Sequence, residues 1–577
     1  MREASCELRR TTGPQGGFSL LLPAIVLGCL GNVFVGSFCV AQEPAAKVGK
    51  KNIAFVETDM CFNCHKGELK LKDFVSTSPG VQWKDRDKHH QSYALLEKNI
   101  ERTNRILGSG IDIREVVKNG KLVKGNISDS LFDDVKTCLA CHATLDTRGG
   151  VREMPTALSV TEGITCQACH GAGHEYYQPH QSKEWRLMTP EFKETLGMRD
   201  LRDPVVRAEL CASCHVGNLS EGKFIRHEWY ANGHPPLPSF EMSAFSQQMP
   251  VHWKPLNKKG EFPGRAKLGL DGNKAQLSTT TYEKANFAFV KDRDINDFIG
   301  HPRTKDVLVS GAVVMRTYVN LVRDYAEKAK ADKEHYSWPE FALYDCTACH
   351  HELRRGTAAD SRPQRRGMPG RPPGMTWPSA LVELGMRHAA GYPDGEVSQV
   401  AEWRQLQSQW EDAFNARPFG NKDTLIKTGK QLDTLLAKQA KALVESPFSR
   451  SAAEKSRQLL TMDKPKERFQ IRDYHTARQI AWAVSEITHD LRGEYASPPS
   501  PQPDTKEPPP LARYEPLFGS VPSDPLMLTL PSGQQDSVIG NLPSALKANA
   551  EFNVKLFQDD LKASRDAGIK QRPATKK

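Results

Sequence analysis

The feature that most constrains this chain is a short motif, Cys-x-x-Cys-His, which occurs five times. This motif is the attachment signature of c-type haem. Its two thiols add to the two vinyl groups of the macrocycle, and the imidazole that follows binds the iron as the proximal ligand. The motifs therefore predict five covalently bound haem c groups. They pair Cys61 with Cys64, Cys138 with Cys141, Cys166 with Cys169, Cys211 with Cys214 and Cys346 with Cys349, and they end at His65, His142, His170, His215 and His350.

The distribution of cysteine argues against other uses of the motif. The chain has 13 cysteines, and every cysteine beyond the first forty residues lies in one of the five motifs. Zinc sites also use Cys-x-x-Cys pairs, but they do not require a histidine directly after each second cysteine. A disulfide framework suits a short secreted chain and has no use for that histidine either. Haem attachment is the interpretation that explains all ten cysteines.

Length and charge limit the broad class of protein. The chain of 577 residues is long enough for two or more domains. Its hydrophobic fraction of 38% is slightly low, which suits a protein whose porphyrins supply part of the apolar core. The net charge of +10 favours an acidic redox partner through electrostatic steering, although mild basicity also aids solubility. No basic stripe is interleaved with aromatic residues, so nucleic acid is not an expected partner.

The N-terminus predicts export from the cytoplasm. Two arginines precede an apolar run over 18–41. The small residues Cys39 and Ala41, at positions −3 and −1, allow signal-peptide cleavage after Ala41. The same run is long enough to remain as an uncleaved membrane anchor, and Cys29 offers a weaker lipidation site. Export agrees with the motifs, because bacteria attach c-type haem outside the cytoplasm. We therefore expect a periplasmic or equivalent envelope location.

The residues after the signal divide into a haem region and a helical region. The pentahaem domain is expected over 42–355, as short helices and Gly/Pro-rich loops with little regular sheet. Its clearest helix is predicted over 306–326, where apolar residues recur at helical spacing. An Arg/Pro/Gly-rich connector over 356–377 precedes a helical domain over 378–497. The expected fold class is mainly α.

Three amphipathic stripes predict a C-terminal helical bundle. Asp473 is a candidate N-cap of the third helix and Gly493 its stop. A stiff Pro-rich linker follows over 498–511, and a tail over 512–577 contains one expected helix at about 544–561. The stripes consist of Trp403, Leu406, Trp410 and Phe414, then of Leu425, Leu432, Leu436 and Leu443, and finally of Ala477, Ile480, Ala481, Val484, Ile487 and Leu491.

Thirteen histidines outside the motifs are available as second axial ligands. An iron that only transfers electrons needs such a ligand, because it leaves no coordination position open. The best local contexts belong to His89, His90, His180, His234 and His252. His351 adjoins a proximal ligand and does not easily reach the opposite face of the same iron. Structural roles are expected for His335, His388, His475 and His489, and weaker ligand candidates are Met198, Met242 and Met249.

The third motif, with its Gly-Ala-Gly continuation and His180, resembles the cytochrome c-554 family. Members of that family are tetrahaem cytochromes that accept electrons from hydroxylamine oxidoreductase. The segments 232–235, 250–253 and 345–353 resemble larger multihaem cytochromes of planctomycete-type bacteria that carry this domain. The resemblance covers about 59–353.

This resemblance implies closely stacked haem pairs with ligands that cross between motifs. It also implies that one haem, held by His142, is five-coordinate. The fifth motif, an insertion over 254–284 and the C-terminal bundle depart from the family pattern. The implied ligands are His180 for the iron of His65, His90 for that of His170, and His234 or His252 for that of His215.

Three functions are compatible with these residues. The first, which we favour, is an exported pentahaem cytochrome that transfers electrons between envelope redox partners and is not an enzyme. The second is a reductase or oxidase of a small nitrogen or sulfur compound that uses one open haem. Pentahaem nitrite reductases commonly replace one proximal histidine with lysine, which does not occur here. The third is a haem subunit that docks through its tail to a larger complex. The sequence assigns no catalytic residue.

Overall fold

The structure is a computed structural model and describes most of the chain after the N-terminal segment. The described residues beyond Lys51 lie in one compact unit. The signal segment 1–41, the insertion 254–284, residues 356–370 of the connector, the linker 498–511 and His350 lie outside the described residues. Those described are 53–67, 78–108, 111–182, 185, 188–250, 252, 302–349, 371–393, 395–462, 471, 473–492, 526–529, 535–538 and 554–566.

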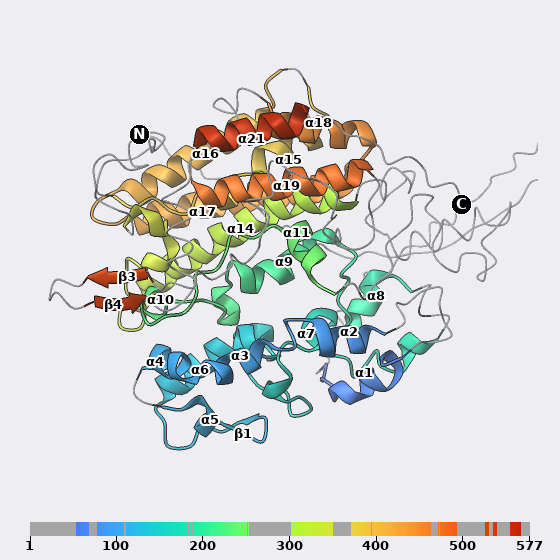
Figure 1. Ribbon diagram of the computed structural model, residues 1–577, viewed down its shortest axis with the longest axis vertical. Helices are drawn as coiled ribbons and strands as arrows, with labels where there is room; N and C mark the ends of the chain where they lie inside the picture. Colours follow the sequence, from blue (N-terminus) through green and yellow to red (C-terminus); the bar gives the residue numbers. More distant parts are fainter. Residues whose placement is uncertain are drawn as a thin grey trace, which may run out of the picture. The chain divides into compact units, whose positions relative to one another are not determined.

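The predicted mainly α fold is confirmed (Figure 1). Short helices dominate the first part of the chain, and a two-stranded hairpin of β1 (Val117–Lys118) and β2 (Lys121–Leu122) interrupts them. These helices are α1 (Thr58–His65), α2 (Pro79–Arg86), α3 (Ser92–Lys98), α4 (Ile100–Leu107), α5 (Ile113–Val116), α6 (Asp129–His142), α7 (Cys166–His170), α8 (Pro190–Thr195), α9 (Pro204–His215), α10 (His227–Ala231) and α11 (Met242–Gln248).

Longer helices dominate the second part, and a second antiparallel pair joins β3 (Leu526–Thr529) to β4 (Gln535–Val538). Single turns of 3₁₀ helix connect several elements, including η7 (Phe341–Leu343), η8 (Cys346–Ala348) and η10 (Trp377–Ser379). The long helices are α14 (Pro302–Ala331), α15 (Val382–Ala389), α16 (Ser398–Asn415), α17 (Lys422–Glu445), α18 (Arg450–Leu460), α19 (Tyr474–Arg492) and α21 (Val554–Asp566).

Helix α14 is the central element of the packing. It contacts α9 of the haem region as well as α17 and α19 of the C-terminal region (Figure 1). Every residue from Val307 to Val314 is buried, as expected for a helix that is covered on all sides. The helix is longer than the predicted 306–326. It begins at Pro302, a residue favoured in the first helical turn, and continues through the good helix formers of its last turn.

One hydrophobic core joins the haem region to the C-terminal helices. Ala208 and Ala212 of α9 pack in the same cluster as Val313 of α14, Leu443 of α17 and Ile480 of α19. The position of the motif at the end of α9 is therefore fixed by residues far along the chain.

Two further sequence predictions concern the C-terminal helices. Asp473 caps α19 as predicted, because its Oδ1 accepts a hydrogen bond of 2.8 Å from the Thr476 amide. In the tail, the described helix is α21, and the preceding residues 544–553 lie outside the described part of the chain. Within the described residues, no helix is both long and apolar enough to cross a membrane.

Candidate haem-binding sites

Four of the five motifs share one local design. Helices α1, α6, α7 and α9 each end at the histidine of a motif. Residues three apart lie on the same face of a helix, so the two thiols of each motif project together. The histidine follows as the last helical residue. This arrangement gives one macrocycle two adjacent attachment points and a proximal imidazole.

Each of these four histidines faces the imidazole of a histidine outside the motifs. Two imidazoles that bind one metal ion at about 2 Å leave their ring centroids roughly 6 Å apart. The residues present therefore fit an iron between the members of every pair. The centroid distances are 6.4 Å for His65 and His180, 6.5 Å for His142 and His234, 6.4 Å for His170 and His252, and 6.3 Å for His215 and His89.

Hydrogen bonds at Nδ1 orient the non-motif rings. A histidine that binds a metal through one nitrogen usually donates the other N–H to a carbonyl or carboxylate. The partners here are the Tyr176 carbonyl for His180 at 3.0 Å, the Pro235 carbonyl for His234 at 2.7 Å, the Pro250 carbonyl for His252 at 3.1 Å and Asp87 Oδ1 for His89 at 2.9 Å.

Burial keeps several of these rings neutral. It lowers the pKa of His170, His215 and His234 to about 4, and the facing histidine adds to each shift. Burial also lowers the pKa of His142, against a hydrogen bond of 2.9 Å to the Ser92 carbonyl. Neutral imidazole is the form that binds a metal.

The pairing agrees with one family-based expectation and differs from another. His180 lies opposite His65, as the resemblance implied. His90 does not face His170, whose facing ring belongs to His252 instead. The His90 ring packs on Trp83 with centroids 4.2 Å apart, and its Nδ1 meets the Glu162 carbonyl at 3.0 Å.

The reason lies in the turn after α2. Asp87 Oδ1 accepts hydrogen bonds of 2.9 Å from both the backbone N–H and Nδ1 of His89. This turn directs His89 towards His215, and the next residue, His90, points to Trp83. His215 is thus faced by His89, where His234 or His252 was expected. The sequence signal that distinguishes the adjacent histidines is the aspartate two residues before His89.

The second site also differs from expectation. The resemblance implied an open position at His142, but His234 lies opposite it. The His234 amide donates to the Trp229 carbonyl at 2.9 Å, and Gly233 supplies the positive φ of 107° that the turn after α10 requires. Arg105 Nε holds the same turn through the Asn232 carbonyl at 3.0 Å. Two helices therefore fix the loop that presents His234.

A cavity adjoins this second site. Its lining combines the attachment residues with apolar side chains, as a porphyrin requires. The lining includes Cys138, Cys141, His142, His234, Leu96, Ile106, Phe224, Trp229 and Leu237.

Interactions between thiols indicate which sites are neighbours. The Cys141 and Cys214 thiols are in hydrogen-bonding contact. Cys169 interacts electrostatically with Cys211, and Cys166 with Cys61. Through these thiols the first site adjoins the third, the third adjoins the fourth, and the fourth adjoins the second.

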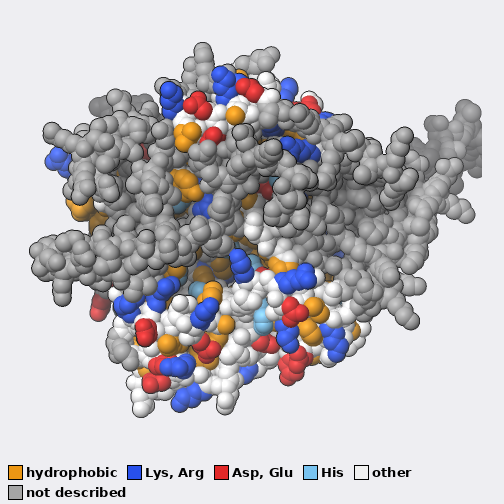
Figure 2. Space-filling model, in the orientation of Figure 1, with side chains coloured by type: hydrophobic (Ala, Val, Ile, Leu, Met, Phe, Trp, Pro, Cys, Tyr) orange, Lys and Arg blue, Asp and Glu red, His pale blue; other side chains and the backbone are white. Residues whose placement is uncertain are grey.

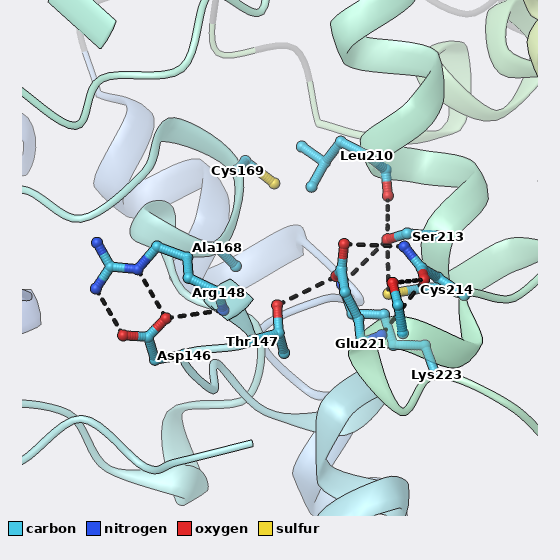
Figure 3. Close-up of polar contacts among 12 residues, drawn as sticks. Asp146, Thr147, Arg148, Ala168, Cys169, Leu210, Ser213, Cys214, Glu221 and Lys223 are labelled. Carbon is cyan, nitrogen blue, oxygen red and sulfur yellow. Dashed lines mark hydrogen bonds and ion pairs between the residues drawn. The ribbon is translucent and has the colours of Figure 1, made fainter. Parts of the chain in front are cut away.

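A buried lysine lies beside the junction of the second and fourth sites (Figure 3). Lys223 Nζ donates to Ser213 Oγ at 3.0 Å and forms an ion pair of 2.5 Å with Glu221. Ser213 in turn donates to the Leu210 carbonyl at 2.7 Å, and Thr147 Oγ1 donates to Glu221 at 3.2 Å. These bonds connect α9 to the loop that follows it.

The fifth site is described only in part. Cys346 and Cys349 are described, and Asp345 before them donates its amide to the Pro373 carbonyl at 2.9 Å. Tyr230 interacts electrostatically with both Cys346 and Cys141, which brings the fifth motif near the second.

His388, outside these sites, fits its expected structural role. Both its ring nitrogens have partners, the Tyr392 hydroxyl and the Pro447 carbonyl, at 3.1 Å each.

Comparison with known proteins addresses the identity of these sites. The family model described as cytochrome c554 and c-prime matches residues 60–171, which contain the first three motifs. The match supports a c-type cytochrome, a family that binds haem c covalently and transfers electrons. The fourth and fifth motifs lie beyond the matched residues. No curated protein and no solved structure matches the chain.

Proposed function

We propose that this cytochrome is an exported pentahaem electron carrier whose irons are bis-histidine ligated at the first four motifs. The observation that carries the proposal is the set of four facing imidazole pairs, with centroids 6.3–6.5 Å apart. Two strong ligands leave no coordination position for a substrate, so the arrangement favours a carrier over an enzyme.

The bound haems supply one-electron chemistry, and the protein supplies attachment, ligands and order. Interactions between motif cysteines support a path through the first, third, fourth and second sites. Tyr230, near both Cys141 and Cys346, supports an extension of that path to the fifth haem.

The proposed partners are redox proteins of the cell envelope, with an acidic surface or haems of their own. The net charge of +10 supports steering of an acidic partner. On the face shown in Figure 2, basic and acidic side chains are interspersed. The attraction of an acidic partner is therefore better explained by the net charge of the whole chain than by a single basic patch. The apolar N-terminal run supports export, by either a cleaved signal or an anchor.

An electron paramagnetic resonance spectrum of the oxidised holoprotein tests the proposal, together with a mass measurement of covalently bound haem. We expect five haems and low-spin ferric signals from at least four of them. A stoichiometric high-spin signal that persists when Cys346→Ala and Cys349→Ala prevent attachment of the fifth haem would contradict bis-histidine ligation at the first four sites. It would favour the alternative, a reductase of a small nitrogen or sulfur compound.

A further inference from the structure

Asp87 distinguishes the fourth site from the other three. The carboxylate is buried, with an exposed fraction of 5%, and accepts from the backbone N–H and Nδ1 of His89 at 2.9 Å each. The corresponding nitrogens of His180, His234 and His252 meet backbone carbonyls instead. At the fourth site, the ring opposite the motif histidine thus forms its Nδ1 hydrogen bond with a carboxylate.

The carboxylate also lies close to a second site. Asp87 interacts electrostatically with His252, which faces His170, and with Cys169 of the same motif. The negative charge therefore lies at the junction of the third and fourth sites, where the Cys169 and Cys211 thiols interact.

We infer that Asp87 lowers the reduction potential of the haem bound at Cys211 and Cys214 below the potentials of its neighbours. This inference rests on the proposed function, in which His89 and His215 bind that iron. A carboxylate that accepts the Nδ1 proton makes the imidazole a stronger electron donor, and second-shell hydrogen bonds of this kind tune a metal. A buried negative charge also favours the ferric state, which carries one more positive charge than the ferrous state. Reduction adds one electron to the iron, and the proton between Asp87 and His89 stays in place.

This role makes Asp87 a positioning and tuning residue within the chain of haems. A haem of low potential between the third and second sites is reduced last and oxidised first. Electrons that pass along the sequence of sites must pass through this haem. Its reduction potential therefore determines how unfavourable electron transfer from the third to the fourth haem is.

Asp87→Asn tests the inference in a spectroelectrochemical titration of the holoprotein. The amide keeps the size of the side chain and removes its charge. We expect the reduction equilibrium of one haem to shift about tenfold towards the ferrous state, which is about 59 mV for one electron. A smaller rise is expected for the haem at His170 and His252. Asp85→Asn is the matched control, because Asp85 lies on α2 two residues earlier and is exposed; its removal should leave all potentials unchanged.

Two results would overturn the inference. One is an unchanged set of potentials in a fully haem-loaded Asp87→Asn protein that keeps its low-spin signals, and the other is an equal shift in Asp85→Asn. Asp87→Glu retains the carboxylate and should restore the low potential.

If Asp87→Asn does not assemble with five haems, a reductive titration of the wild-type protein still decides the matter. We expect the low-spin signal that His89→Ala removes, which belongs to the haem bound at Cys211 and Cys214, to be the last of the four bis-histidine signals lost on reduction. Its loss before the signals of the neighbouring haems would refute the inference. Failure of the proposed function can be distinguished from failure of this inference. If His89 does not bind the iron at His215, the wild-type protein itself gives a high-spin signal.

Discussion

The imidazole rings of His142 and His234 face each other with centroids 6.5 Å apart and an interplanar angle of 76°. His142 ends α6, and His234 lies in a loop held by hydrogen bonds to Trp229 and Arg105. The second site is thus arranged like the first, third and fourth. The resemblance to the c-554 family implied an open position here, and the loop that carries His234 provides a facing imidazole instead.

Replacement of His234 by alanine should open this position. The iron at His142 would keep a single imidazole, so we expect one high-spin ferric signal, equivalent to one haem, and carbon monoxide binding by the reduced protein. His335→Ala is the matched control, because His335 is exposed and pairs with Asp332; it should leave the spectrum unchanged. A purely low-spin spectrum from fully loaded His234→Ala would mean that His234 is not a ligand.

The buried carboxyl of Glu241 should make stability depend on pH. Glu241 is fully buried and accepts from Ser243 N, Ala244 N and Ser310 Oγ at 3.0, 2.8 and 3.2 Å. Burial raises the pKa of Glu241 to about 8, whereas an unfolded glutamate titrates near 4.3. Between these values the folded state binds more protons than the unfolded state. The free energy of unfolding therefore falls as pH rises, by at most about 1.4 kcal/mol per pH unit from this group.

Urea titrations at pH 5, 6.5 and 8 measure this effect. Glu241→Gln should reduce the fall in stability between pH 5 and 8 but not abolish it, because burial also raises the pKa of Asp490 to about 7. The exposed Glu402→Gln on α16 serves as the control. An identical pH dependence in wild-type and Glu241→Gln proteins would refute the assignment.

The features that sequence predicted well are local ones. Haem attachment needs only five consecutive residues, so the motifs were read directly from the chain. The helix around Tyr318 and the cap at Asp473 were also predictable, because apolar periodicity and capping depend on residues within a few turns. The longer extent of α14 was missed because its terminal turns are polar and carry no periodic signal.

The pairing of imidazoles was not predictable in the same way. His215 and His89 lie far apart in the sequence and meet only when α9 packs against the core it shares with α14 and α19. Adjacent His89 and His90 are equivalent by composition, and only the turn made by Asp87 separates their directions. The arrangement at His142 differs from the family pattern for a related reason, since the loop after α10 belongs to the part of the chain beyond the family match.

The ion pair between Lys223 and Glu221 gives a further prediction. Lys223→Met leaves Glu221 without its cation beside the second and fourth sites. Because the Glu221 side chain is 31% exposed, we expect a loss of about 1–3 kcal/mol in the free energy of unfolding. The double variant Lys223→Met/Glu221→Gln should lose less than the single variant in urea titrations. Equal losses would show that the lysine acts through packing and not through charge.

The last prediction concerns α21, which bears on whether the tail docks to a partner or to its own chain. Phe557 and Leu561 are buried, with exposed fractions of 0% and 2%, in the cluster that includes Leu460 of α18 and Leu491 of α19. Arg457 Nη2 of α18 also donates to the Ser564 carbonyl at 2.6 Å.

Phe557→Ala should therefore reduce the packing free energy of α21 by about 3–5 kcal/mol, enough to release the helix from the bundle. Limited proteolysis should then cleave within or just before α21, while the haem spectrum stays unchanged. The neighbouring Leu556 is 42% exposed, so Leu556→Ala is a matched control that should resist cleavage like the wild type. If Phe557→Ala is as protease-resistant as the wild type, α21 does not depend on this contact. That result would favour the alternative in which the tail docks to a larger complex.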